Sequence, residues 1–162
     1  MKKLLLLVTI LCLSVISHAQ TYKFYQTRNI HNQLRLNTKT GEVYQMQDDG
    51  QKFIIKYAVT TSNEQANRYA LFETKNMWTF ILLDRYTGKL WQCQYSVDGP
   101  EYQFSIPINE RILASGNRPV FTIEPLVSMY QYYLINEDNG EMWKFQWTTK
   151  NEDGYRWIEK IY

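Results

Sequence analysis

Short apolar runs separated by polar turns make up most of the chain after its first twenty residues. Residues 77–83 are almost continuously apolar, which is typical of a strand buried on both faces. Residues 89–95 alternate instead, with apolar side chains on one face and two glutamines on the other. A turn at residues 84–88, with an aspartate at its start and a glycine at its end, joins the two runs. The pattern predicts antiparallel strands and no long helix.

This pattern occurs three times along the chain, since residues 22–47, 69–94 and 121–146 align without a gap. Each segment carries an Asn or Asp, then a Gly, then an aromatic residue, then a Gln, at fixed spacing. In chain order these positions are Asn37, Gly41, Tyr44 and Gln47; Asp84, Gly88, Trp91 and Gln94; Asn136, Gly140, Trp143 and Gln146. A fourth apolar run follows each segment after a glycine-containing loop. We therefore predict three tandem units of about 47 residues, over about 21–66, 67–117 and 118–162.

Four consecutive strands per unit predict an all-β domain over residues 20–162, with four-stranded antiparallel units in a pseudo-threefold arrangement. Propeller blades have this construction, and we expect a three-bladed, propeller-like fold. The alternative is a β-trefoil, although the Gln-x-Trp signature of ricin-type trefoils is not found. Residues 82–92, LLDRYTGKLWQ, resemble the hairpin of quinoprotein-type propeller repeats. Residues 80–94 also fit the pattern FxLLDxxxGxxWQxQ and resemble small exported proteins of Bacteroidota, a resemblance that implies no activity.

The N-terminus has the three parts of a secretory signal peptide. Lys2 and Lys3 precede an apolar stretch at residues 4–16, and Ser17-His18-Ala19 forms a small-x-small cleavage site. The apolar stretch is shorter than the roughly 20 residues needed to span a bilayer. We predict removal of residues 1–19, cleavage near Ala19–Gln20, and a soluble protein in the periplasm or outside the cell.

Charge and composition of the remaining chain exclude several classes of function. Without Lys2 and Lys3 the 18 basic residues become 16, equal to the 16 acidic ones, whereas nucleic-acid binders carry a basic excess. One cysteine, Cys93, and one histidine, His31, remain, too few for an internal disulfide or a zinc site. All 25 aromatic residues remain, enough for a substantial core. We expect a monomer with no metal, cofactor, nucleic-acid partner or membrane span.

Catalytic arrangements are weakly supported by the same residues. The chain has no G-x-S-x-G elbow to accompany His31, and Cys93 takes the place of Met46 and Phe145 in the other units, as a core residue does. Acidic pairs at 48–49, 137–138 and 152–153 each lie beside a glycine, as turn residues do. We therefore do not expect an enzyme, and a glycan-acting hydrolase using two of these carboxylates is the least favoured alternative.

Two sets of residues are candidates for ligand binding. The first set recurs in every unit, where glutamine amides could converge on an axis and aromatic rings could stack on sugars: Gln47, Gln94, Gln146, Tyr44, Trp91 and Trp143. The alternative is that the glutamines join neighbouring strands and the rings fill the core. The second set lies in the long loop 109–119, namely Glu110, Arg111, Ile112, Leu113, Asn117 and Arg118, unless that loop is a plain connector.

These observations favour a non-catalytic binding module that recognises a protein or a glycan outside the cytoplasm. A periplasmic immunity or inhibitor protein, which blocks an incoming toxin or a protease, is the alternative.

Overall fold

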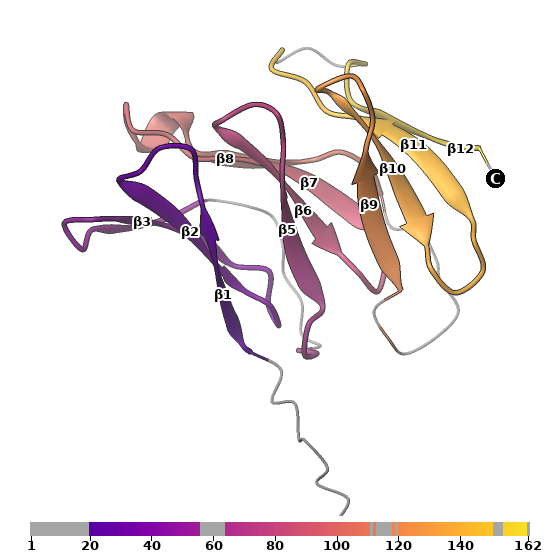
Figure 1. Cartoon of the computed structure of the whole chain (residues 1–162), viewed down its shortest axis with the longest axis horizontal. Coiled ribbons are helices and arrows are strands. Elements are labelled where there is room, and N and C mark those ends of the chain that lie inside the picture. The colour runs from indigo at the N-terminus through magenta and orange to yellow at the C-terminus, as the bar shows by residue number, and fades with distance from the viewer. Residues whose placement is uncertain are drawn as a thin grey trace, which may run out of the picture.

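The computed structural model describes residues 20–55, 64–110, 112, 118, 120–150 and 154–161 and confirms the all-β fold (Figure 1). The predicted signal peptide therefore lies outside the described residues. The elements in chain order are β1 (Tyr22–Gln26), β2 (Asn32–Asn37), β3 (Val43–Gln47), β4 (Lys52–Ile54), β5 (Tyr69–Glu73), β6 (Thr79–Asp84), β7 (Lys89–Gln94), the short 3-10 helix η1 (Pro100–Tyr102), β8 (Phe104–Pro107), β9 (Phe121–Pro125), β10 (Gln131–Asn136), β11 (Met142–Gln146) and β12 (Trp157–Lys160).

The strands form three separate four-stranded antiparallel sheets, each made by one predicted unit. The first sheet is β1–β4, the second is β5–β8 and the third is β9–β12, with neighbouring strands paired in chain order. Strand β6 is buried along its whole length, as its continuous apolar sequence predicts. Its Leu82 lies between Leu71 of β5 and Trp91 of β7, so these three side chains share one face of the sheet.

Among the described residues, two hydrophobic cores join the sheets in a row. One lies between the first and second sheets and is built around Leu34, Leu36 and Leu82. The other lies between the second and third sheets and is built around Leu83 and Phe121. The second sheet is therefore covered on both faces, and the first and third sheets lie at opposite ends of the row (Figure 1).

The same backbone contact recurs where each sheet meets the next. The amide of Tyr69 donates to Thr38 O at 2.9 Å, and the amide of the equivalent Phe121 donates to Arg85 O at 3.0 Å. The repeated glycine is explained here as well. A Cβ on Gly41 would lie 3.0 Å from the ring of Tyr69, and both this glycine and its counterpart have positive φ. Close approach of successive sheets therefore requires glycine at the turn.

The three sheets differ in closure from a β-trefoil, which is one of the two arrangements considered above. Among the described residues, strands pair only within their own sheet, so they do not form the barrel of a β-trefoil. The row of sheets is compatible with a propeller-like arrangement. In the described part of the chain, however, each core joins only successive sheets, and none joins the third sheet to the first. No described helix is long and apolar enough to cross a membrane.

Candidate functional site

The end of the third strand is built in the same way in all three sheets. The residue after this strand donates its amide to a backbone carbonyl just before the second strand, so both side chains are presented at equivalent places. The three bonds are Asp48 N to His31 O at 3.1 Å, Tyr95 N to Trp78 O at 3.1 Å and Trp147 N to Tyr130 O at 3.0 Å. The three positions share this backbone contact, and they differ in their side chains and in the preceding sheet that packs against them in the second and third sheets.

In the second and third sheets this position holds a pair of aromatic rings. Trp78 and Tyr95 lie with ring centroids 5.2 Å apart, and Tyr130 and Trp147 lie 5.0 Å apart. Tyr95 and Trp147 are both fully buried. The Trp147 indole also donates to Met129 O at 3.1 Å. The first pair is tilted and the second is edge-to-face, and aromatic pairs stabilise a core beyond the area they bury, so both pairs are structural.

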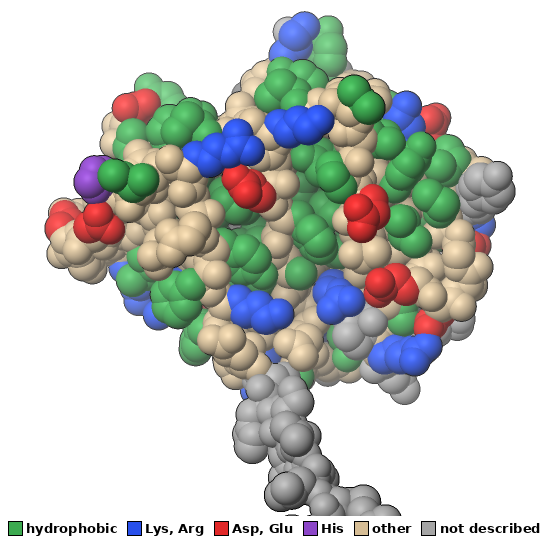
Figure 2. Space-filling view, viewed as in Figure 1, with side chains coloured by type: hydrophobic (Ala, Val, Ile, Leu, Met, Phe, Trp, Pro, Cys, Tyr) green, Lys and Arg blue, Asp and Glu red, His purple; other side chains and the backbone are tan. Residues whose placement is uncertain are grey.

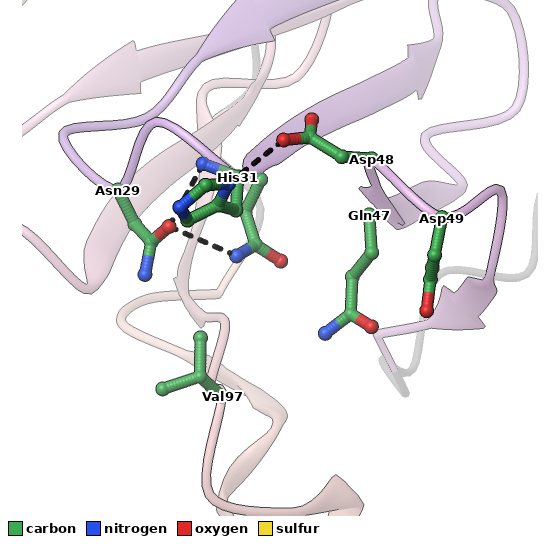
Figure 3. A pocket seen from close by; sticks show the side chains of 7 residues that line it. Asn29, His31, Gln47, Asp48, Asp49 and Val97 are labelled. Atoms are coloured by element: carbon green, nitrogen blue, oxygen red, sulfur yellow. Dashed lines mark hydrogen bonds and ion pairs between the residues drawn. The ribbon is translucent and has the colours of Figure 1, made fainter.

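The first sheet has a histidine and an aspartate at the same place. His31 Nδ1 lies 2.8 Å from Asp48 Oδ2, and both side chains are mostly exposed. Beside this pair lies a hollow of about 400 Å³ (Figure 3), compared with about 130 Å³ at the equivalent place in the second sheet. The described residues that line the larger hollow are Asn29, His31, Asn32, Gln47, Asp48, Asp49 and Val97. Val97 comes from the second sheet, so the hollow lies where the first two units meet.

Hydrogen bonds hold the polar wall of this hollow in place. Asn29 Oδ1 accepts from the amide of His31 at 3.0 Å and from Asn32 Nδ2 at 3.2 Å. Asn32 Oδ1 in turn accepts from the buried Gln45 Nε2 at 2.7 Å, and Gln45 Nε2 also donates to Ser96 O at 2.8 Å. The wall is therefore fixed to the second sheet before any ligand arrives.

The lining is rich in hydrogen-bonding groups. Carboxamides and carboxylates supply several donors and acceptors in a small volume. The described lining contains no Ser, Thr or Cys, so the His31–Asp48 pair has no nucleophile of those types beside it. The described residues also contain no group of three His, Cys, Asp or Glu that could hold a metal ion.

The three recurrent glutamines occupy equivalent places near the loop before the fourth strand. Gln94 Nε2 donates to Tyr102 O at 3.2 Å, and Gln146 Nε2 donates to Tyr155 O at 3.1 Å. In these two units the amide therefore joins the third strand to the following loop. Gln47 lines the hollow instead, and it is the member of the predicted set that remains a ligand candidate.

The recurrent aromatic residues divide in a similar way. Trp91 and Trp143 are buried in the cores that join the sheets. Tyr44 lies on the face of the first sheet that is turned away from the second. There its ring contacts two cations, with Arg35 Cζ 4.9 Å and Lys52 Nζ 4.8 Å from the ring centroid. Two of the three predicted platforms thus belong to the core, and Tyr44 does not line the hollow.

The long loop 109–119 is described at only some of its positions. Ile112 packs against the core between the second and third sheets and donates its amide to Thr87 O at 2.7 Å. Glu110 Oε2 lies 3.5 Å from Lys89 Nζ, and Arg118 forms an ion pair with Asp138. The other three predicted positions, Arg111, Leu113 and Asn117, lie outside the described residues.

Cys93 is confirmed as a core residue. Its side chain is fully buried between the first two sheets, and burial raises the pKa of its thiol to about 12. Its Sγ lies 3.2 Å from Ser105 Oγ. A thiol with this pKa is not a nucleophile at neutral pH.

Sequence reasoning missed most of the hollow. Asn29 lies in a turn, Asn32 begins β2 and Val97 belongs to the second unit, and no spacing rule connects them. The available signal was the repeat itself, because His31 and Asp48 stand where both other units have aromatic residues. That departure marks the one unit in which the aromatic pair is replaced by ionisable groups.

Comparisons of the chain with protein-family models, curated proteins and solved structures give no match.

Proposed function

We propose that this chain is an exported, non-catalytic binding module whose ligand site is the polar hollow of the first unit. The observation that carries the proposal is the replacement of an aromatic pair, of which one ring is fully buried, by His31 and Asp48 at one of three equivalent positions. The replacement opens about 400 Å³ at a place where the second unit leaves about 130 Å³. Export rests on the signal-like N-terminus of the sequence.

The lining favours a neutral glycan end as the ligand. Its carboxamides, carboxylates and imidazole can pair with sugar hydroxyls, which both donate and accept hydrogen bonds. Asp48 and Asp49 disfavour an anionic ligand because they would lie against its charge. Val97 offers one apolar contact. The volume is in the lower part of the range of small-molecule sites, about 300–1,000 Å³, and so suits one or two sugar rings.

A titration with neutral and acidic oligosaccharides tests this function. Calorimetry should detect binding of at least one neutral sugar by the unmodified protein and none of its acidic counterpart. The double variant H31W/D48Y restores the aromatic pair of the second unit, fills the hollow and should remove binding while the protein stays folded. Tyr102→Ala, at an exposed residue of the second unit, is the matched control and should bind as before.

Two results would count against the glycan proposal. Unchanged sugar binding by H31W/D48Y would mean that the site lies elsewhere. If no sugar binds and the protein stably captures one protein partner from the periplasm, the immunity or inhibitor function is favoured instead.

A further inference from the structure

The two ends of the row of sheets each present a face whose counterparts inside the row are buried. The first outer face belongs to the first sheet and includes Tyr22, Phe24, Arg35 and Tyr44. The third outer face belongs to the third sheet and includes Glu124, Ile135, Met142, Lys144 and Ile161. In the second sheet the same two faces are covered by its neighbours.

The third outer face is apolar at the positions that form cores elsewhere. The amide of Ile161 donates to Met142 O at 2.9 Å, and Ile55 and Ile108 make the same bond in their own sheets. Ile55 is 0 % exposed and Ile108 is 8 % exposed, whereas Ile161 is 41 % exposed. The third sheet therefore keeps the residues of a sheet-to-sheet contact without a described sheet against them.

The glycine turn of the third sheet is open in the same way. Gly41 lies against the ring of Tyr69, and Gly88 lies against the ring of Phe121. Near Gly140 no described atom lies within 4 Å of a Cβ built on the residue, although its φ of +75° repeats the same turn. Tyr22 is the equivalent of those two rings, and it is 42 % exposed on the first outer face. An unfilled glycine turn and an exposed matching ring thus lie at opposite ends of one chain.

The polar positions of these two faces are complementary in charge. Gln45 contacts Ser96 of the next sheet, and the equivalent Gln92 Oε1 accepts from the amide of Thr148 at 3.4 Å. In the third unit the glutamine is replaced by Lys144, and in the first unit the position of the serine is held by Asp49. A contact built like the two inside the chain would bring this lysine toward this aspartate, which also lines the hollow, so the proposed junction lies beside the ligand site.

A second complementary pair occupies the centre of the same faces. The amide of Leu71 donates to the hydroxyl of Tyr25 at 3.3 Å, and Leu71 pairs in register with Leu82. Glu124 is the third-unit equivalent of Tyr25, and Arg35 is the first-unit equivalent of Leu82. The two outer faces therefore carry a glutamate at the place of Tyr25 and an arginine at the place of Leu82, which is next to the residue that Tyr25 contacts.

We propose that the third outer face docks onto the first outer face of a second copy of this chain. Two such contacts related by a twofold axis would close a ring of six four-stranded sheets. Propellers have about 4–8 blades, so two copies reach a number that one chain does not. A head-to-tail contact of this kind forms a ring when its rotation closes. The dimer departs from the monomer expected from the sequence.

One internal contact has no equivalent at the proposed junction. Arg28 donates to Thr74 O and Lys75 O across the first junction, and Lys75 makes the equivalent bonds to Leu126 O and Val127 O across the second. The corresponding residue of the third unit is Val127, which has no donor on its side chain. We therefore expect an association that is weaker than the internal junctions and depends on concentration.

Sedimentation velocity of the purified protein over a range of concentrations tests the proposal. The expected result is a reversible change from one to two chain masses. Ile135→Glu should leave only the single-chain mass, while Tyr102→Glu, which adds the same charge away from both outer faces, should not change the equilibrium. Circular dichroism of each variant checks that the fold is retained.

A charge exchange provides an independent readout. Lys144→Asp should raise the dissociation constant at least about tenfold, because it places like charges opposite each other. Adding Asp49→Lys in the same chain should restore association to near its original strength. Three results would each overturn the six-sheet ring. They are a single-chain mass at every concentration, masses above two chains, and a dimer whose dissociation constant neither Ile135→Glu nor Lys144→Asp changes.

Discussion

The first and second sheets have the same backbone hydrogen bond at the end of their third strands. The side chains there are ionisable in the first sheet and aromatic in the second. In the second sheet Trp78 and Tyr95 fill the space with two rings, and Tyr95 is fully buried. In the first sheet His31 and Asp48 stand there, exposed and hydrogen-bonded to each other beside a hollow. The repeat therefore fixes where a side chain is placed, whereas the individual unit decides whether that place is filled by core side chains or left open.

The largest expected effect comes from giving the second unit the residue of the first. Tyr95→Asp removes a buried ring and puts a carboxylate in its place. Loss of a buried aromatic side chain alone costs about 3–5 kcal/mol, and burial of the charge adds to it. The reverse change, Asp48→Tyr, should alter the free energy of unfolding by no more than about 0.5 kcal/mol, as at an exposed site. Urea denaturation measures both, and equal losses would mean that the two positions do not differ in burial.

A smaller loss is expected at the turn that precedes the third strand. The buried Asp84 forms an ion pair with Arg68, with Oδ2 lying 2.7 Å from Nη2. The other units have Asn37 and Asn136 at this position. Asp84→Asn keeps the turn cap but removes the charge facing Arg68. We expect a loss of about 2–3 kcal/mol, somewhat below that for a fully buried pair because Arg68 keeps some contact with solvent.

The control for this ion-pair prediction is Asn37→Asp. Residue 21, which stands where the second unit has Arg68, is a threonine. Because Asn37 is buried and an aspartate there would lack an arginine partner, the substitution should lower the free energy of unfolding by more than about 1 kcal/mol. A stabilising effect of Asn37→Asp, or no loss from Asp84→Asn, would contradict a specific role for the pair.

Alkaline pH should weaken the junction between the first two sheets. Burial raises the pKa of Cys93 from 9.0 to about 12, so between these values the unfolded thiol loses a proton that the folded thiol retains. Stability therefore falls as pH rises above 9, by about 1.4 kcal/mol per pH unit, or about 2 kcal/mol at pH 10.5. The measurement is the difference in unfolding free energy between the protein and Cys93→Ala at pH 7 and pH 10.5. A difference that does not change with pH would contradict the buried thiol.

The smallest effect on stability is expected in the hollow itself. His31 and Asp48 form an exposed pair, and such pairs contribute about 0–1 kcal/mol. His31→Ala should shift the thermal unfolding midpoint by little, and yet it should weaken ligand binding strongly. A large loss of stability would indicate that the pair belongs to the scaffold.

Much of the scaffold could be predicted from periodicity alone. Continuous apolar residues in β6 and alternation in β7 predicted the strands, and the repeated Asn or Asp and Gly predicted the turns between them. Placement of Cys93 in the core followed from its equivalents in the other units. These features are local, or are repeated within the chain, so one sequence contains enough information to find them.

The arrangement of the sheets and the site could not be predicted in the same way. Convergence of the three glutamines required a closed threefold axis, whereas Gln94 and Gln146 bind their own loops. The hollow combines Asn29 and Gln47 of one unit with Val97 of the next, and that proximity depends on how two sheets pack. Contacts between sheets arise from shape and twist, which the pattern of apolar residues does not specify.

Nuclear magnetic resonance gives the sharpest test of whether one unit of three binds the ligand. Amide spectra of the protein, titrated with the neutral sugar that binds most strongly in calorimetry, report every unit at once. We expect shifts at Asn29, His31 and Asp48, with the equivalent residues Trp78 and Tyr95 unmoved. Equal shifts in all three units, or shifts confined to the second and third, would contradict this expectation.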